Sequence, residues 1–116
     1  GLEHVKILAD VQVKHATMLS SQITVEMSAK DAVGNGADAI IVTGAVIGAE
    51  TPIDMLQRVQ KVVNVPLLAG SGVNHKNIHE QLNIADGCII GSSLKKGGII
   101  SNPIDYDLVR EVIEAK

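Results

Sequence analysis

Apolar residues along the chain alternate between two spacings, which predicts four repeats of a strand followed by a helix. Apolar runs of strand length lie at Val5–Val13, Ala37–Gly44, Val65–Ala69 and Asp86–Ile90. Apolar residues at helical spacing lie at Ile23–Val33, Thr51–Val63, His75–Leu82 and Tyr106–Ala115. This order predicts an α/β fold with four parallel strands in sequential order and helices on one side of the sheet.

The predicted helix ends carry residues that favour capping. Gly34-Asn35-Gly36 is expected to end the first helix, because glycine accepts the backbone conformation that follows a helix C-terminus. Thr51 followed by Pro52 is expected to begin the second helix as N-cap and first residue. Asn74 is expected to cap the third helix.

The last two predicted strands both end in glycine and serine. The first ends in Gly70-Ser71-Gly72-Val73, and the second in Gly91-Ser92-Ser93. Glycine-rich turns let peptide N–H groups converge on an anion, and a helix beginning directly after the turn would add further donors. The pair resembles the phosphate site that barrels build after strands seven and eight, and predicts one shared phosphate. The alternative is two ordinary strand-to-helix turns.

The first strand carries polar residues on one parity. Asp10, Gln12 and Lys14 alternate with Ala9, Val11 and Val13, so the polar set is expected to point toward the barrel axis and the apolar set toward the helices. Asp10 and Lys14 are either a structural ion pair or catalytic groups. His15, at the strand end, is either a loop histidine or a catalytic acid–base group.

Composition narrows the possible partners. The 116 residues have a formal net charge of −3 and contain one Tyr but no Phe or Trp, so we expect no nucleic-acid binding. No apolar run approaches membrane-spanning length, which predicts no membrane insertion and a cytoplasmic location. Cys88 is expected to be a small buried thiol. His75 and His79 are expected to be exposed, and we predict no metal site there.

Four segments together resemble the BtpA family. They are Asp10–His15, Asp38–Gly44, Val65–Val73 and Ala85–Lys95, with Asn102-Pro-Ile-Asp105 leading into the last helix. The resemblance covers essentially the whole chain and implies the C-terminal half of a (β/α)8 TIM barrel, as one half-barrel domain over residues 1–116. A full barrel of this type needs about 250 residues. The family is linked to photosystem I biogenesis in cyanobacteria and to uncharacterised predicted barrel enzymes elsewhere.

Two functions follow as expectations. The first is binding of a small phosphorylated metabolite by an enzyme or enzyme half, with Asp10, Lys14 and His15 as catalytic candidates. The second is a non-catalytic biogenesis factor that uses the barrel as a scaffold. The expected partner is a second copy of the chain or a missing N-terminal half, because four βα units leave open edges. The sequence identifies neither cofactor nor substrate.

Overall fold

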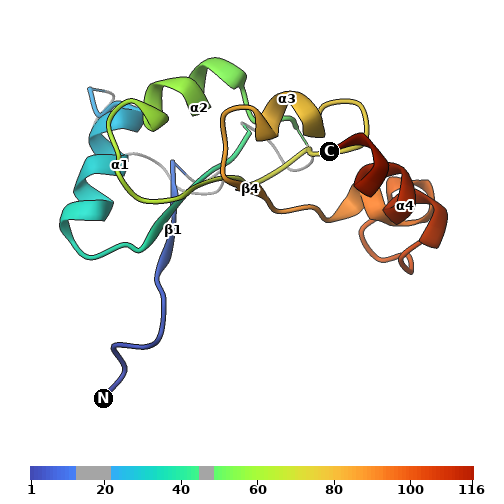
Figure 1. Cartoon of the computed structure of the whole chain (residues 1–116), viewed down its shortest axis with the longest axis horizontal. Coiled ribbons are helices and arrows are strands. Elements are labelled where there is room, and N and C mark those ends of the chain that lie inside the picture. The colour runs from blue at the N-terminus through green and yellow to red at the C-terminus, as the bar shows by residue number, and fades with distance from the viewer. Residues whose placement is uncertain (13–21, 45–48) are drawn as a thin grey trace.

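In a computed structural model, residues 1–12, 22–44 and 49–116 are described, and they form one parallel sheet with helices (Figure 1). The strands are β1 (Leu8–Val11), β2 (Ala39–Val42), β3 (Leu67–Ala69) and β4 (Gly87–Cys88). The helices are α1 (Val25–Gly34), α2 (Ile53–Gln60), α3 (Ile78–Leu82) and α4 (Tyr106–Ala115). Two short 3₁₀ turns, η1 (Ser92–Leu94) and η2 (Lys96–Gly98), follow β4.

The sheet has the predicted topology of half a (β/α)8 barrel. Its strand order is β1-β2-β3-β4, and each neighbouring pair is parallel. Asp10 lies opposite Ile41, which lies opposite Leu68, so one row of residues crosses the first three strands. All four carboxyl ends therefore meet at one edge of the sheet, where the predicted site residues are gathered.

One face of the sheet packs on the helices and forms the core. Ile40, Val42 and Leu67 are almost fully buried there, together with Leu56 and Val59 from α2. Figure 1 shows α1, α2 and α3 along the same face. Ile41 on the other face is only half-buried. The reason is that helices cover a single face.

The observed strands are shorter than the strands that the apolar runs predicted. Residues 5–7 precede β1, and Ile7 is 56% exposed despite sharing the parity of Ala9. β4 keeps two residues of the predicted Asp86–Ile90. An edge strand has one neighbour, so fewer of its backbone groups enter the hydrogen-bond ladder.

Two predicted helix caps are wrong, and one is confirmed. Thr51 is not the N-cap of α2; that position is Pro52, while the Thr51 side chain is buried under the sheet edge. The N-cap of α3 is Asn77 instead of Asn74, which shortens the helix to five residues. At the end of α1, Gly36 has φ +97° and its N–H donates to Val33, as the glycine pattern predicted.

Candidate phosphate-binding site

The turn after β3 is held against the segment that leads into α2. The Gly44 N–H donates to Ser71 Oγ at 2.9 Å, and Ser71 Oγ donates to the Ala49 carbonyl at 2.9 Å. Gly72 has φ +67°, and a Cβ on it would lie 2.4 Å from the Glu50 nitrogen. Glycine is therefore required at position 72 both for its conformation and for its lack of a side chain.

Among the described residues, three of the four predicted donors in this turn have no hydrogen-bond partner. Within the described ranges, the backbone N–H groups of Ser71, Gly72 and Val73 make no hydrogen bond. The Gly70 N–H is different, because it donates to the Val42 carbonyl at 2.7 Å and extends the sheet. The predicted role of Gly70 as an anion donor is therefore corrected. Glycine is still needed at position 70 for packing, since a Cβ there would lie 2.6 Å from the Ile41 and Thr43 methyl carbons.

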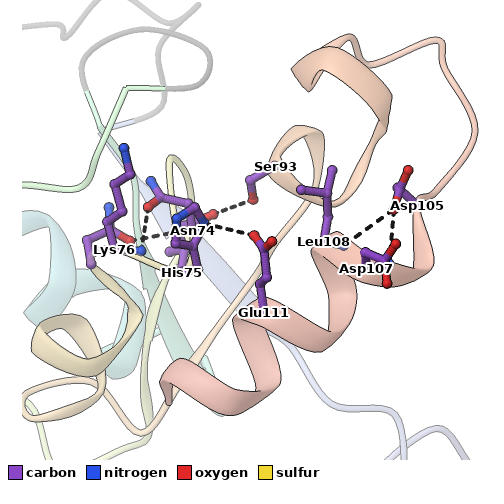
Figure 2. A network of polar contacts seen from close by, with 10 residues as sticks. Asn74, His75, Lys76, Ser93, Asp105, Asp107, Leu108 and Glu111 are labelled. Carbon is purple, nitrogen blue, oxygen red and sulfur yellow. Dashed lines mark hydrogen bonds and ion pairs between the residues drawn. The ribbon is translucent and has the colours of Figure 1, made fainter.

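The turn after β4 lies directly beside the first. Ser93 Oγ donates to the Val73 carbonyl at 2.5 Å, as Figure 2 shows for the Ser93 side chain. The N–H groups of Gly91, Ser92 and Ser93 have no hydrogen-bond partner among the residues described, because they precede and open the short turn η1. The structure thus brings together the two turns that the sequence singled out.

The helix after the first turn does not contribute to the site in the expected way. It begins at Ile78, whereas the turn ends at Val73. Asn74, His75 and Lys76 form an intervening turn in which Asn74 Oδ1 accepts from the Lys76 N–H at 2.9 Å. The candidate donors are consequently the peptide groups of the turn itself, without the charge of a helix end close by.

The predicted catalytic residues are only partly described. Asp10 is exposed at the carboxyl end of β1, on the face opposite the helices, which is the side predicted for the barrel axis. Lys14 and His15 lie outside the described residues, so the pairing of Asp10 with Lys14 stays a prediction. Gln12, two residues after Asp10, has φ +56°, an uncommon left-handed conformation for a non-glycine residue.

The histidines and the cysteine near the turns are the remaining candidate groups. His75 and His79 are exposed as expected, and His75 Nδ1 lies 3.7 Å from Glu111 Oε2 on α4 (Figure 2). In the described ranges, no group of three or more His, Cys, Asp or Glu side chains is arranged to hold a metal ion. Cys88 is half-buried, and burial raises the pKa of its thiol, which favours the unreactive protonated form.

Sequence reasoning missed a set of buried polar side chains behind the first turn. Thr51 and Gln81 are fully buried and Asn77 nearly so. Gln81 Nε2 donates to the Thr51 carbonyl at 2.9 Å and to Glu50 Oε1 at 3.2 Å. A polar residue inside an apolar helix pattern was the available signal for Gln81, but Thr51 resembles an ordinary cap in sequence.

Four parallel βα units with glycine turns at the carboxyl edge define this chain as an α/β half-barrel of the TIM class. It belongs to the BtpA family, whose sequence profile matches residues 2–116. Among the residues described, no helix is both long enough and apolar enough to cross a membrane.

Similar proteins occur in archaea, bacteria and animals. The uncharacterized protein MJ1115 of Methanocaldococcus jannaschii is 40% identical over 110 residues, which is 94% of this chain and 41% of that protein. The putative sgc region protein SgcQ of Escherichia coli is 32% identical over 115 residues, which is 98% of this chain and 43% of that protein. The chain therefore spans about two fifths of the length of these relatives.

A solved structure shares the fold. Wild-type GGGPS from Thermoplasma volcanium superimposes with a TM-score of 0.52 and 23% identity, over 73% of this chain and 33% of that one. The match supports the barrel architecture, as the parallel strand order does.

Proposed function

We propose that this chain binds the phosphate group of a small phosphorylated metabolite between the turns at residues 70–73 and 91–93. The observation that carries the proposal is the Ser93–Val73 hydrogen bond, which joins two turns whose N–H groups, apart from that of Gly70, are unpaired within the described ranges. Several peptide N–H groups gathered at one place favour an anion, and the site needs no cationic side chain.

The proposal suits the charge of the chain. With a net charge of −3, long-range attraction of anions is weak, so affinity must come from local dipoles. The Lys95 ammonium, which lies close in sequence, donates to the Ile100 carbonyl at 2.6 Å and is held in its own loop. Asp10, at the same sheet edge, is the described residue we assign to acid–base or electrostatic work on the bound metabolite.

Thermal-shift measurements with inorganic phosphate and a panel of sugar and nucleotide phosphates test the proposal. A ligand at about a hundred times its dissociation constant stabilises a protein by about 2.7 kcal/mol, which gives a clear rise in Tm. Sodium chloride at matched ionic strength is the control, because general screening would act equally in both series. No response to any phosphate compound would contradict the proposal and favour the non-catalytic scaffold instead.

A further inference from the structure

The carbonyl groups of Ser71, Gly72 and Val73 each accept a hydrogen bond from a side chain outside the turn. The Ser71 carbonyl accepts from Thr51 Oγ1 at 3.3 Å, and the Val73 carbonyl accepts from Ser93 Oγ at 2.5 Å. The Gly72 carbonyl accepts from Asn74 Nδ2 at 3.1 Å and from Asn77 Nδ2 at 3.0 Å. Each carbonyl oxygen of residues 71–73 therefore has a partner, whereas none is seen for the N–H groups of the same residues in the described chain.

Because the peptide group is planar, the direction of each carbonyl also sets the direction of the N–H of the next residue. A carbonyl and the N–H of the following residue lie in one rigid plane and point in opposite directions. Fixing the Ser71 carbonyl therefore fixes the direction of the Gly72 N–H, and fixing the Gly72 carbonyl fixes that of the Val73 N–H. The side chains hold two unpaired donors of the turn in place without occupying them.

The donors that hold these carbonyls are themselves well anchored. Thr51 is fully buried, its one hydroxyl proton is shared between the Ser71 and Val42 carbonyls at 3.3 and 3.2 Å, and its own carbonyl accepts from the buried Gln81 amide. Asn77 is 7% exposed, and its Oδ1 accepts from the Asn74 N–H at 2.8 Å. Buried side chains with several hydrogen bonds have little freedom, so the turn they hold is rigid before any ligand arrives.

We infer that Thr51, Asn74 and Asn77 are positioning residues that orient the N–H groups of Gly72 and Val73 for phosphate. This rests on the proposed phosphate site and adds how that site is built. Donors that are oriented in advance need no reorganisation on binding, so their orientation contributes directly to affinity.

Titration of the full chain with inorganic phosphate, followed through the backbone amide NMR signals, tests the inference. In the wild-type chain the Gly72 and Val73 amide signals are expected to shift with phosphate. Thr51→Val keeps the side-chain volume but removes the hydroxyl, and is expected to weaken phosphate binding by roughly tenfold and to reduce those shifts. Thr51→Ser keeps the hydroxyl and is expected to restore both.

A matched control separates positioning from stability. Thr24→Val removes a comparable hydroxyl from the N-cap of α1, where Thr24 Oγ1 accepts from the Met27 N–H at 3.2 Å. It is expected to lower Tm and leave the phosphate dissociation constant unchanged. Should Thr51→Val fold poorly, Asn74→Ala, at a half-buried position, tests the same inference through the Gly72 carbonyl.

The outcomes distinguish the two proposals. If the wild-type chain binds phosphate and both Thr51→Val and Asn74→Ala bind it equally well, the positioning role is wrong while the site stands. If the wild-type amides of residues 71–73 and 91–93 do not respond to phosphate, the proposed site fails, and the inference that rests on it fails too.

Discussion

At the scale of single residues, the candidate site depends on one glycine that the backbone of another segment covers. Gly72 combines φ +67° with an approach of 2.4–2.5 Å between its would-be Cβ and the Ala49 and Glu50 backbone. Both neighbours are main chain, which cannot move aside as a flexible side chain would. The tight contact couples the turn after β3 to the segment before α2, so a backbone shift in one of these segments displaces the other.

Gly72→Ala is expected to lower the free energy of unfolding by about 2–4 kcal/mol, because it combines a left-handed alanine with an overpacked contact. Urea unfolding measures the effect. Gly34→Ala is the matched control, since Gly34 ends α1 with nothing within 4 Å of its would-be Cβ. The control is expected to be neutral or stabilising by up to about 1 kcal/mol. Equal losses in both variants would argue against the close contact at Gly72.

At the scale of elements, α1 and α2 are joined across their exposed surfaces by one bidentate ion pair. Arg58 Nε lies 2.6 Å from Glu26 Oε1, and its second nitrogen lies 2.8 Å from Glu26 Oε2. Hydrogen bonds from the Arg58 guanidinium are the main cause that lowers the pKa of Glu26 to about 2. Planar two-point contact of this kind is stronger than an ordinary surface ion pair, although solvent still screens it.

The lowered pKa predicts how stability depends on pH. Because the folded-state pKa of Glu26 is below its usual value of 4.5, the carboxylate stabilises the fold above that pH, and the contribution is lost as pH falls toward 2. Glu26→Gln is expected to lower Tm by a few degrees at most at pH 7, and the gap to wild type should narrow below pH 4.5.

Scanning calorimetry at a series of pH values measures this gap. Glu114→Gln is the control, since Glu114 meets Arg110 only at 3.9 Å on the exposed side of α4. A Glu26→Gln gap that does not exceed that of the control, or that stays constant down to low pH, would contradict the role of the pair.

At the scale of the whole molecule, the half-barrel leaves apolar surface open. In the described sheet, β1 and β4 are edge strands with one neighbour each. On the face away from the helices, Leu8 is 49% exposed and Ile89 is 46% exposed, and Leu68 is half-buried. Val42 of the neighbouring strand is fully buried against the helices. Its neighbour Ile41 takes the open position, because side chains alternate along a strand.

The open surface continues beside β1 and on α4. A groove of about 1030 Å³ is lined by β1 and α1, including Asp10, Gln12 and Met27. On α4, Val112 is buried but Ile113 is 55% exposed, so the apolar stripe of this helix is only partly covered. Figure 1 shows α4 to one side of the other helices. Two open edge strands, an open apolar sheet face and a partly exposed apolar helix stripe are together typical of a protein–protein interface.

We propose that two copies of the chain associate, each placing β1 beside β4 of the other, to give an eight-stranded barrel with both phosphate sites on one rim. This two-fold arrangement pairs every open edge and covers the apolar face. Sedimentation velocity over micromolar concentrations should show a dimer. A soluble, well-folded monomer throughout that range would refute the proposal. If the chain associates only with separately supplied βα units from a longer relative, those units and not a second copy are its partner.

The amino-acid sequence by itself determined the order of elements, the parallel sheet and the two glycine turns. These follow from local signals: apolar spacing distinguishes strand from helix, and glycine marks places where the backbone needs room. The end of α1 just before Gly36 was predictable for the same reason. Such features depend on residues that are close together in the chain.

Only the tertiary structure decided which groups of the site are available. The Gly70 N–H is taken by Val42, and Thr51 leaves its expected capping role to hold the Ser71 carbonyl. The buried Gln81 donates to the Thr51 carbonyl behind the turn. These contacts join residues 20–30 positions apart. A hydrogen bond between distant residues depends on how strands and helices pack, and no local pattern in the sequence encodes that packing.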